Sequence, residues 1–308
     1  MSLKIDIGGS SWIGDRDNQE DCYMAYNMEE ERPRRATRFN VDYTRLVSMG
    51  VLCDGMGGEG KGDQCACLAV QKFAEAFAET GSFKTDWVRR MEMALYAANA
   101  AITDYKQATG DYDQATGKVS SRSGCVMVAT VICDEHLYYI SVGDACIWLF
   151  RRTETPNGTR YQQYRINRPH SVYTKFTVES GIRKKEVITP EEAEELSRNC
   201  LPGVTVKTNP CSALIGDDIN FIDNSIHSPL RDGNKGGIRL KPGDIIILAS
   251  DGVEKGLGPI SFESVMRDFG DEDYSAAQTA AELIKKVEEQ STGKSDNSSC
   301  VVFKVAAK

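Results

Sequence analysis

The chain has 308 residues, of which 41% are hydrophobic and 27% are charged, and its formal net charge is −8 at pH 7. This composition is typical of a soluble globular protein, and the negative charge disfavours nucleic acid and anionic membranes as partners. No apolar run approaches the roughly 20 residues that cross a bilayer, and no signal peptide is expected. The ten cysteines include no Cys-x-x-Cys pair, so we expect a reduced, cytoplasmic protein.

The hydrophobic pattern of the first half predicts strands, then two helices, then more strands. Early strands are expected at 3–13, 22–26 and 47–54. Apolar residues at helical spacing predict a helix over about 61–78 and a second helix that begins at Asp86 and carries its apolar stripe to Tyr105. Three further strands with short connections, and therefore antiparallel, are expected at 124–133, 137–142 and 146–150.

The second half begins with a segment of different character. Residues 168–237 hold five of the nine prolines, and we interpret 172–237 as an irregular insertion within a single domain of residues 1–308. One short helix is expected there, opened by Pro190 after the capping-box residue Thr189. A strand at 245–250, a helix after Ser275 and a last strand at 300–303 follow. Because strands and helices do not alternate, we predict an α+β fold of stacked antiparallel sheets with helices outside.

Carboxylates recur where these predicted strands start or end, next to Gly or Asn. They are Glu20, Asp21, Asp54, Asp251 and Asp296. Clustered carboxylates are costly unless a cation compensates them, and a set of oxygen ligands without His or Cys favours Mg²⁺ or Mn²⁺. Two ions bridged by Asp54, with the Gly55 carbonyl beside it, would activate a water molecule for attack on a phosphate ester.

Local sequence leaves three features open. Arg16 is either neutralised by neighbouring acids on a solvated turn or binds an anion through its planar guanidinium. Gly143-Asp144 is an ordinary hairpin dipeptide, so Asp144 is first interpreted as structural. The arginine-rich stretch 32–45 is either a solvated extension or a surface for an acidic or phosphorylated partner.

Taken together, six short motifs resemble those of the metal-dependent serine/threonine protein phosphatases of type 2C, in the order of that family. They are Arg16-x-x-Gln19-Glu20-Asp21, Asp54-Gly55-Met56-Gly57-Gly58, Ser123-Gly124, Val142-Gly143-Asp144, Ser250-Asp251-Gly252 and Asp296-Asn297-x-Ser299. The resemblance implies a four-layer α-β-β-α sandwich, with two antiparallel sheets flanked by helices and a flap insertion at about 172–237.

The resemblance also implies a role for each site residue. Asp54 would bridge two Mn²⁺ or Mg²⁺ ions, with Glu20 and the Gly55 carbonyl completing one site. Asp251 and Asp296 would complete the other site, and Asp21 would support the ligands from behind. Arg16 would hold the substrate phosphate, and Asp144 becomes a candidate ligand of a third ion.

The implied function is hydrolysis of phosphoserine or phosphothreonine in a phosphorylated protein substrate. The enzyme is expected to be a monomer, and a cognate Ser/Thr kinase is an expected partner. Met56 departs from the histidine of eukaryotic members, and Ala145-Cys146 departs from the usual Ser-Arg. The main alternative is a catalytically silent binding or scaffold protein, which would require a lost ligand. A nucleotide phosphodiesterase is disfavoured by the order of the motifs and by the acidic charge.

Overall fold

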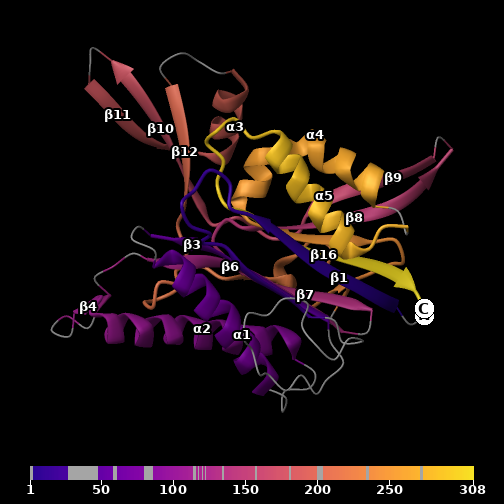
Figure 1. Ribbon diagram of the computed structural model, residues 1–308, viewed down its shortest axis with the longest axis horizontal. Helices are drawn as coiled ribbons and strands as arrows, with labels where there is room; N and C mark the ends of the chain where they lie inside the picture. The colour runs from indigo at the N-terminus through magenta and orange to yellow at the C-terminus, as the bar shows by residue number, and fades with distance from the viewer. Residues whose placement is uncertain are drawn as a thin grey trace.

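The computed structural model describes residues 3–26, 48–57, 61–79, 86–113, 116, 118–119, 121, 123–133, 135–156, 158–179, 182–199, 204–233, 236–270 and 273–308. Two antiparallel sheets lie face to face between two pairs of helices (Figure 1). The arginine-rich stretch 32–45 lies outside the described residues, so its two interpretations stay predictions.

The first sheet brings the two ends of the chain together. Its strand order is β1 (Leu3–Trp12), β16 (Ser298–Ala307), β15 (Ile245–Ala249), β8 (Cys146–Thr155) and β9 (Gly158–Arg165). Strands β1 and β16 pair antiparallel along their whole length, from Leu3 opposite Ala307 to Trp12 opposite Ser298. The residues that follow β1 therefore lie beside the residues that precede β16, although almost the whole sequence separates them.

The second sheet carries the predicted aspartate-glycine strand, which lies next to the edge strand of the sheet. Its order is β13 (Asp223–Asn224), β7 (His136–Val142), β6 (Gly124–Cys133), β3 (Ser48–Met56) and β2 (Cys22–Tyr26), and β14 (Ile238–Arg239) also pairs with β7. Strand β3 is buried from Ser48 to Cys53 and becomes partly exposed at Asp54. The sheet thus holds this carboxylate rigidly at the point where the buried part of the strand ends.

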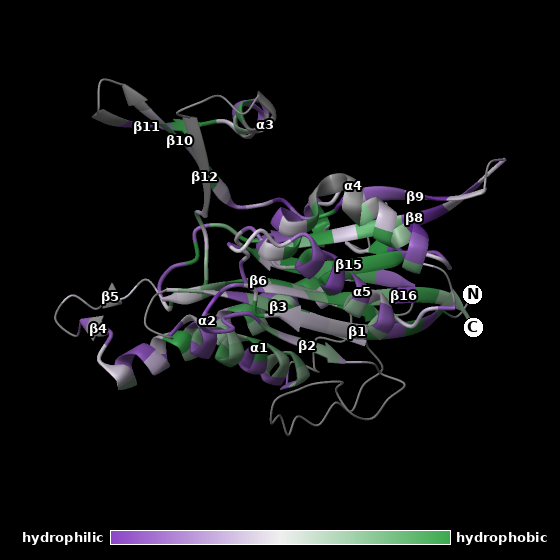
Figure 2. Cartoon of the chain, turned by 45° about the horizontal axis from the view of Figure 1, so that its top comes forward, coloured by the Kyte–Doolittle hydropathy of each residue, from purple (hydrophilic) through white to green (hydrophobic). Residues whose placement is uncertain are grey.

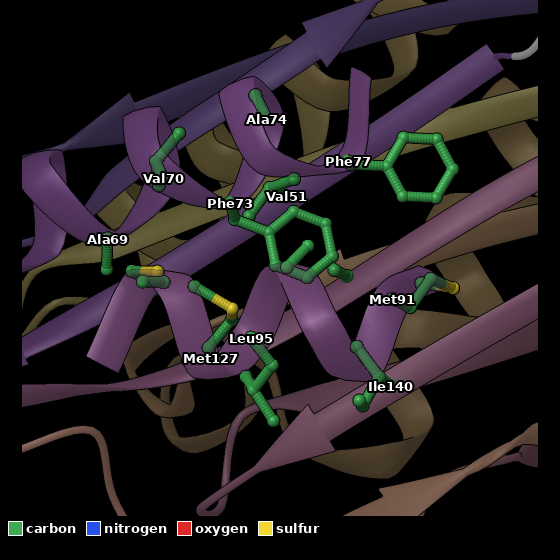
Figure 3. Packing of buried hydrophobic residues seen from close by; sticks show 14 of the residues in the cluster. Val51, Ala69, Val70, Phe73, Ala74, Phe77, Met91, Leu95, Met127 and Ile140 are labelled. Carbon is green, nitrogen blue, oxygen red and sulfur yellow. The ribbon is translucent and has the colours of Figure 1, made fainter. Parts of the chain in front are cut away.

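Three apolar layers hold the sandwich together. Helices α1 (Gly62–Glu79) and α2 (Trp87–Thr109) cover the second sheet, and Phe73 of α1 contributes a fully buried ring to this layer, which also contains Val51 and Met127 (Figure 3). Helices α4 (Asp251–Phe269) and α5 (Ala276–Glu289) cover the first sheet. A third layer fills the space between the sheets. The predicted α-β-β-α sandwich and the helix over 61–78 are confirmed.

The prediction that residues 172–237 are irregular apart from one short helix is wrong for the first part of the insertion, up to Pro210. It contains a three-stranded antiparallel sheet in the order β11 (Ile182–Ile188), β10 (Ser171–Glu179) and β12 (Val204–Pro210), together with α3 (Pro190–Asn199). This unit projects from the body of the sandwich (Figure 2). The prolines flank the strands or end them, so the strand-forming residues between them were undervalued. The short helix that begins at Pro190 is confirmed.

Helix α4 has no counterpart among the predicted elements. It contains Gly252, Gly256, Gly258 and Pro259, residues that disfavour a helix interior. Burial of Val253, Leu257, Phe262, Val265 and Met266 against the first sheet stabilises it instead. Small elements that the sequence did not predict are β4 (Tyr112–Asp113), β5 (Lys118–Val119) and the 3-10 helix η1 (Ser225–His227). Within the described part of the chain, no helix has the length and apolar character needed to span a membrane.

Candidate active site

Asn297 stabilises the acidic loop that follows β1 through hydrogen bonds of its side chain. Its amide nitrogen Nδ2 donates to the carbonyl oxygens of Ile13 at 2.7 Å and Asn18 at 3.0 Å. Its Oδ1 accepts from the backbone N–H of Glu20 at 2.8 Å, and the residue is buried. The side chain of Asn297, which directly precedes β16, therefore fixes the backbone path of residues 13–20 and the position of Glu20.

Replacing Asn297 with alanine is expected to release this loop. The substitution removes three hydrogen bonds at a buried position, which should lower the free energy of unfolding by roughly 2–3 kcal/mol. Amide hydrogen exchange over residues 14–20 should accelerate, whereas exchange in β6 should change little. N297D, which keeps an acceptor for Glu20 but loses both donors, should give an intermediate effect. Unchanged exchange over 14–20 in N297A would refute this role.

Glu20 lies between β3 and the start of α1. Its carbonyl oxygen accepts from the backbone N–H of Gly55 at 3.1 Å. A Cβ atom placed on Gly62 would lie 2.7 Å from Glu20 Oε1, so the carboxylate approaches the helix start as closely as a glycine permits. Burial raises the pKa of Glu20, the charge of Arg16 lowers it, and the charges of Asp63 and Asp296 raise it.

Asp21 is held from behind by Ser250, the residue between β15 and α4, which Ser299 of β16 holds in turn. Ser250 Oγ donates to Asp21 Oδ2 at 2.9 Å, and Ser250 Oγ itself accepts from the backbone N–H of Ser299 at 3.0 Å. Asp21 is 8% exposed, and burial raises its pKa to about 7, with the charges of Asp251 and Asp296 adding to the rise. The other oxygen, Asp21 Oδ1, is buried without a hydrogen-bond partner.

Asp54 is influenced by the charges of four other aspartates. Burial raises its pKa well above the usual range, and the negative charges of Asp21, Asp251, Asp144 and Asp296 raise it further. Removal of a carboxylate from water and repulsion by neighbouring carboxylates both disfavour its charged form. The acids from the two ends of the sequence and from β3 are therefore close enough for their charges to raise the pKa of Asp54.

Two cations pair with the acids from the C-terminal half. Arg16 Nη2 lies 2.9 Å from Asp296 Oδ2, and the Arg16 side chain is 56% exposed. Lys255, one helical turn after Asp251 on α4, forms an ion pair with Asp251. The sequence interpretation placed Arg16 at this site but overlooked Lys255, because the helix that positions it was not predicted.

Asp144 lies in the turn between β7 and β8, at the edge of the acid cluster. Burial raises its pKa to about 6, and the charge of Asp251 contributes to the rise. Its carbonyl oxygen accepts from Arg165 Nη2 at 3.1 Å, and Arg165 also pairs with Glu254 at 3.2 Å. The preceding residue, Gly143, donates its N–H to His170 Nδ1 at 3.1 Å. Arg165 and Glu254 were not recognised as supports of this turn, because they lie on other elements.

The residues present are chemically suited to divalent cations. The donor set consists of oxygen atoms, Asp21 Oδ1 has no partner, and Gly62 leaves space beside the Glu20 carboxylate. Among the described residues, however, no three His, Cys, Asp or Glu side chains converge as closely as metal ligands do. The structure therefore brings the predicted acids into one neighbourhood, and their individual roles as ligands stay predictions.

A comparison of the sequence with protein families identifies the relationship. The family model of protein phosphatase 2C matches residues 36–291. The chain belongs to the protein phosphatase 2C family. The matched range includes Asp54, Asp144 and Asp251, whereas Arg16, Glu20, Asp21 and Asp296 lie outside it. No significant match is found among curated protein sequences.

Solved structures share the fold of this phosphatase-family chain. The serine/threonine phosphatase PstP/Ppp of Mycobacterium tuberculosis is 19% identical with a TM-score of 0.63, and all of both chains is covered. The serine/threonine phosphatase of S. agalactiae is 16% identical with a TM-score of 0.63, covering 98% of this chain and 99% of that one. The catalytic domain of PstP in complex with two manganese ions is 19% identical with a TM-score of 0.60, covering 99% of this chain and 100% of that one.

Proposed function

We propose that the protein is a metal-dependent phosphatase that hydrolyses phosphoserine and phosphothreonine in protein substrates. The observation that carries the proposal is the mutual electrostatic influence of Asp54, Asp21, Asp251, Asp144 and Asp296, which come from distant parts of the sequence. Family membership and a fold shared with a manganese-bound phosphatase domain support the same function.

The acid cluster is proposed to hold two Mn²⁺ or Mg²⁺ ions. Asp54, Glu20 and the Gly55 carbonyl are assigned to one, and Asp54, Asp251 and Asp296 to the other, with Asp144 reserved for a third. Such ions supply positive charge and activate a water molecule near neutral pH. Asp21 positions the cluster through its hydrogen bond from Ser250.

Arg16 is proposed to bind the substrate phosphate. Its exposed guanidinium stands over Asp296 at the rim of the acid cluster, and a guanidinium can donate two parallel hydrogen bonds to phosphate oxygens. An arriving phosphate would replace Asp296 as the anionic partner of Arg16. Because the chain supplies no apparent covalent nucleophile in a recognised motif, attack by water fits the residues best.

The test compares Arg16 variants on a phosphothreonine peptide with Mn²⁺. Loss of a charge-assisted hydrogen-bond pair should lower kcat/KM of R16A by about 10- to 100-fold, and R16K should recover part of the loss. Mn²⁺ affinity, measured by calorimetry, should not fall in either variant. A wild-type protein that binds Mn²⁺ but releases no phosphate from the peptide would refute the proposal. Preferential hydrolysis of a cyclic nucleotide would favour a phosphodiesterase instead.

The setting of the reaction is part of the proposal. The nine cysteines that the structure describes are free thiols, which supports a reducing, cytoplasmic compartment. We infer a monomeric enzyme whose phosphorylated protein substrates are produced by a Ser/Thr kinase. Sedimentation velocity of the purified protein would test the monomeric state.

A further inference from the structure

Residues 14–17 lie between the two points at which Asn297 holds the backbone of the loop after β1. The Asn297 amide reaches the carbonyl oxygens of Ile13 and Asn18, so the chain between these two residues needs an anchor of its own. Arg16, which is proposed to bind the substrate phosphate, belongs to this stretch, and its side chain is exposed. The position of its guanidinium group therefore depends on what holds the backbone on either side of it.

Asp15 supplies such an anchor by exchanging hydrogen bonds with Ser295. The backbone N–H of Asp15 donates to the carbonyl oxygen of Ser295 at 3.0 Å, and Asp15 Oδ2 accepts from the backbone N–H of Ser295 at 2.7 Å. Ser295 directly precedes Asp296, whose Oδ2 lies 2.9 Å from Arg16 Nη2. The residue before Arg16 is thus bound to the residue before the ionic partner of Arg16.

A chain of hydroxyl groups reaches the same oxygen atom of Asp15. Ser295 Oγ donates to Ser291 Oγ at 2.8 Å, and Ser291 Oγ donates to Asp15 Oδ2 at 3.2 Å. The direction of the second bond is fixed, because an ionised carboxylate only accepts hydrogen bonds. Two hydrogen bonds from the loop after α5 therefore converge on Asp15 Oδ2.

The close approach of the two loops requires a glycine at position 14. Gly14 has a φ of 68°, in the left-handed region that residues with a side chain rarely adopt. A Cβ atom on Gly14 would lie 2.7 Å from the carbonyl oxygen of Ser295 and closer still to that of Asp296. The two loops are therefore in direct backbone contact, so a movement of either loop changes the position of Arg16 relative to Asp296.

We propose that Asp15 is a positioning residue, which holds Arg16 at the rim of the acid cluster in the arrangement that receives the substrate phosphate. The inference rests on the proposed function and adds to it a residue that contacts neither the substrate nor the metal ions. Without this anchor, Arg16 would occupy the phosphate-binding position for a smaller fraction of the time, and the apparent affinity falls in proportion to that fraction. Because Arg16 would bind the phosphate both before and during hydrolysis, the loss should appear in KM rather than in kcat.

The test measures the hydrolysis of a phosphothreonine peptide by D15A in the presence of Mn²⁺. KM should rise by about 3- to 10-fold, whereas kcat and the Mn²⁺ affinity measured by calorimetry should change by about twofold at most. D15N should recover most of the loss, because both hydrogen bonds end on one oxygen atom and an amide oxygen can accept them. The matched control is D17A, which removes an exposed carboxylate on the other side of Arg16 and should leave KM unchanged.

A double-mutant cycle with R16A separates positioning of Arg16 from a general loss of stability. If Asp15 acts through Arg16, D15A should lower kcat/KM little further once R16A is present. An equal fold-loss from D15A with and without R16A would overturn the inference. So would a KM of D17A as high as that of D15A, or a fall in the Mn²⁺ affinity of D15A, which would show that Asp15 acts on the metal-binding acids instead.

Hydrogen exchange of the full-length, metal-free protein distinguishes failure of this inference from failure of the proposed function. Amide exchange in peptides that cover residues 13–18 and 291–296 should accelerate in D15A and stay unchanged in D17A. Unchanged exchange in D15A would overturn the inference. Wild-type protein that releases no phosphate from the peptide would contradict the proposed function, and the exchange measurement would still decide whether Asp15 anchors the loop.

Discussion

Replacing Asp54 with asparagine is expected to lower Mn²⁺-dependent phosphatase activity by about 10³-fold or more. The charges of Asp21, Asp251, Asp144 and Asp296 all act on Asp54. Asp54 is therefore the acid that connects the others, and none of them can take over its role as the bridging ligand. The same substitution should raise the free energy of unfolding of the metal-free protein, because it removes a carboxyl group whose ionisation is disfavoured by burial and by the neighbouring acids. Hydrolysis of a phosphothreonine peptide and urea denaturation measure the two effects.

The matched control is D104N, which changes an exposed aspartate on α2. It should leave both the activity and the stability of the metal-free protein close to those of the wild type. D54N should also lose most of the stabilisation that Mn²⁺ gives to the wild-type protein. If D54N retained full activity and the full Mn²⁺ stabilisation, Asp54 could not be the central ligand. If the wild type lacked activity while D54N kept partner binding, the silent scaffold would be the better account.

The metal-free protein is expected to lose stability as the pH rises from about 4 to about 7. Burial raises the pKa of Asp21 to about 7 and that of Asp144 to about 6. The folded state therefore binds more protons than the unfolded state in this range, and the free energy of unfolding falls as the pH increases. For Asp21 the raised pKa corresponds to a loss of roughly 4 kcal/mol between the two ends of the range.

Saturating Mn²⁺ should reverse this pH dependence. Carboxylates must lose their protons to bind a metal ion, so Mn²⁺ should stabilise the protein most strongly above pH 7 and least near pH 5. Urea denaturation at several pH values, with chelator or with Mn²⁺, tests both slopes. D21N should flatten the slope of the metal-free protein. Metal-free stability that increases steadily from pH 5 to pH 8 would contradict this account of the acids.

The parts of the fold that the sequence predicted are those with a strong local pattern. Strand β3 could be located because an apolar run ends at Asp54 and Gly55, and α1 because Phe73 and Phe77 continue a helical stripe. Helix α4 could not be predicted, since Gly256 and Pro259 argue locally against a helix and burial against the first sheet stabilises it. The strands β10, β11 and β12 of the insertion were missed for the opposite reason. Their residues favour strands, but the prolines around them are typical of loops.

The acids of the candidate site could be proposed from the sequence because each of them lies within a buried strand or next to one end of it. The residues that position them were not. Asn297 reaches residues 13–20 because of the β1–β16 register, and this pairing is not visible in either segment alone. Lys255 and Arg165 act on Asp251 and Asp144 from α4 and β9, so their roles depend on tertiary packing. The sequence motifs identify the candidate ligands, whereas the residues that position them are recognised only in the folded structure.

The most direct test of the central claim is a crystal structure of the protein grown with Mn²⁺, with anomalous scattering used to locate the ions. We predict two strong anomalous peaks bridged by the Asp54 carboxylate, one beside Glu20 and the Gly55 carbonyl and the other beside Asp251 and Asp296. Anomalous peaks elsewhere in the molecule, with none among these acids at a saturating Mn²⁺ concentration, would contradict the account.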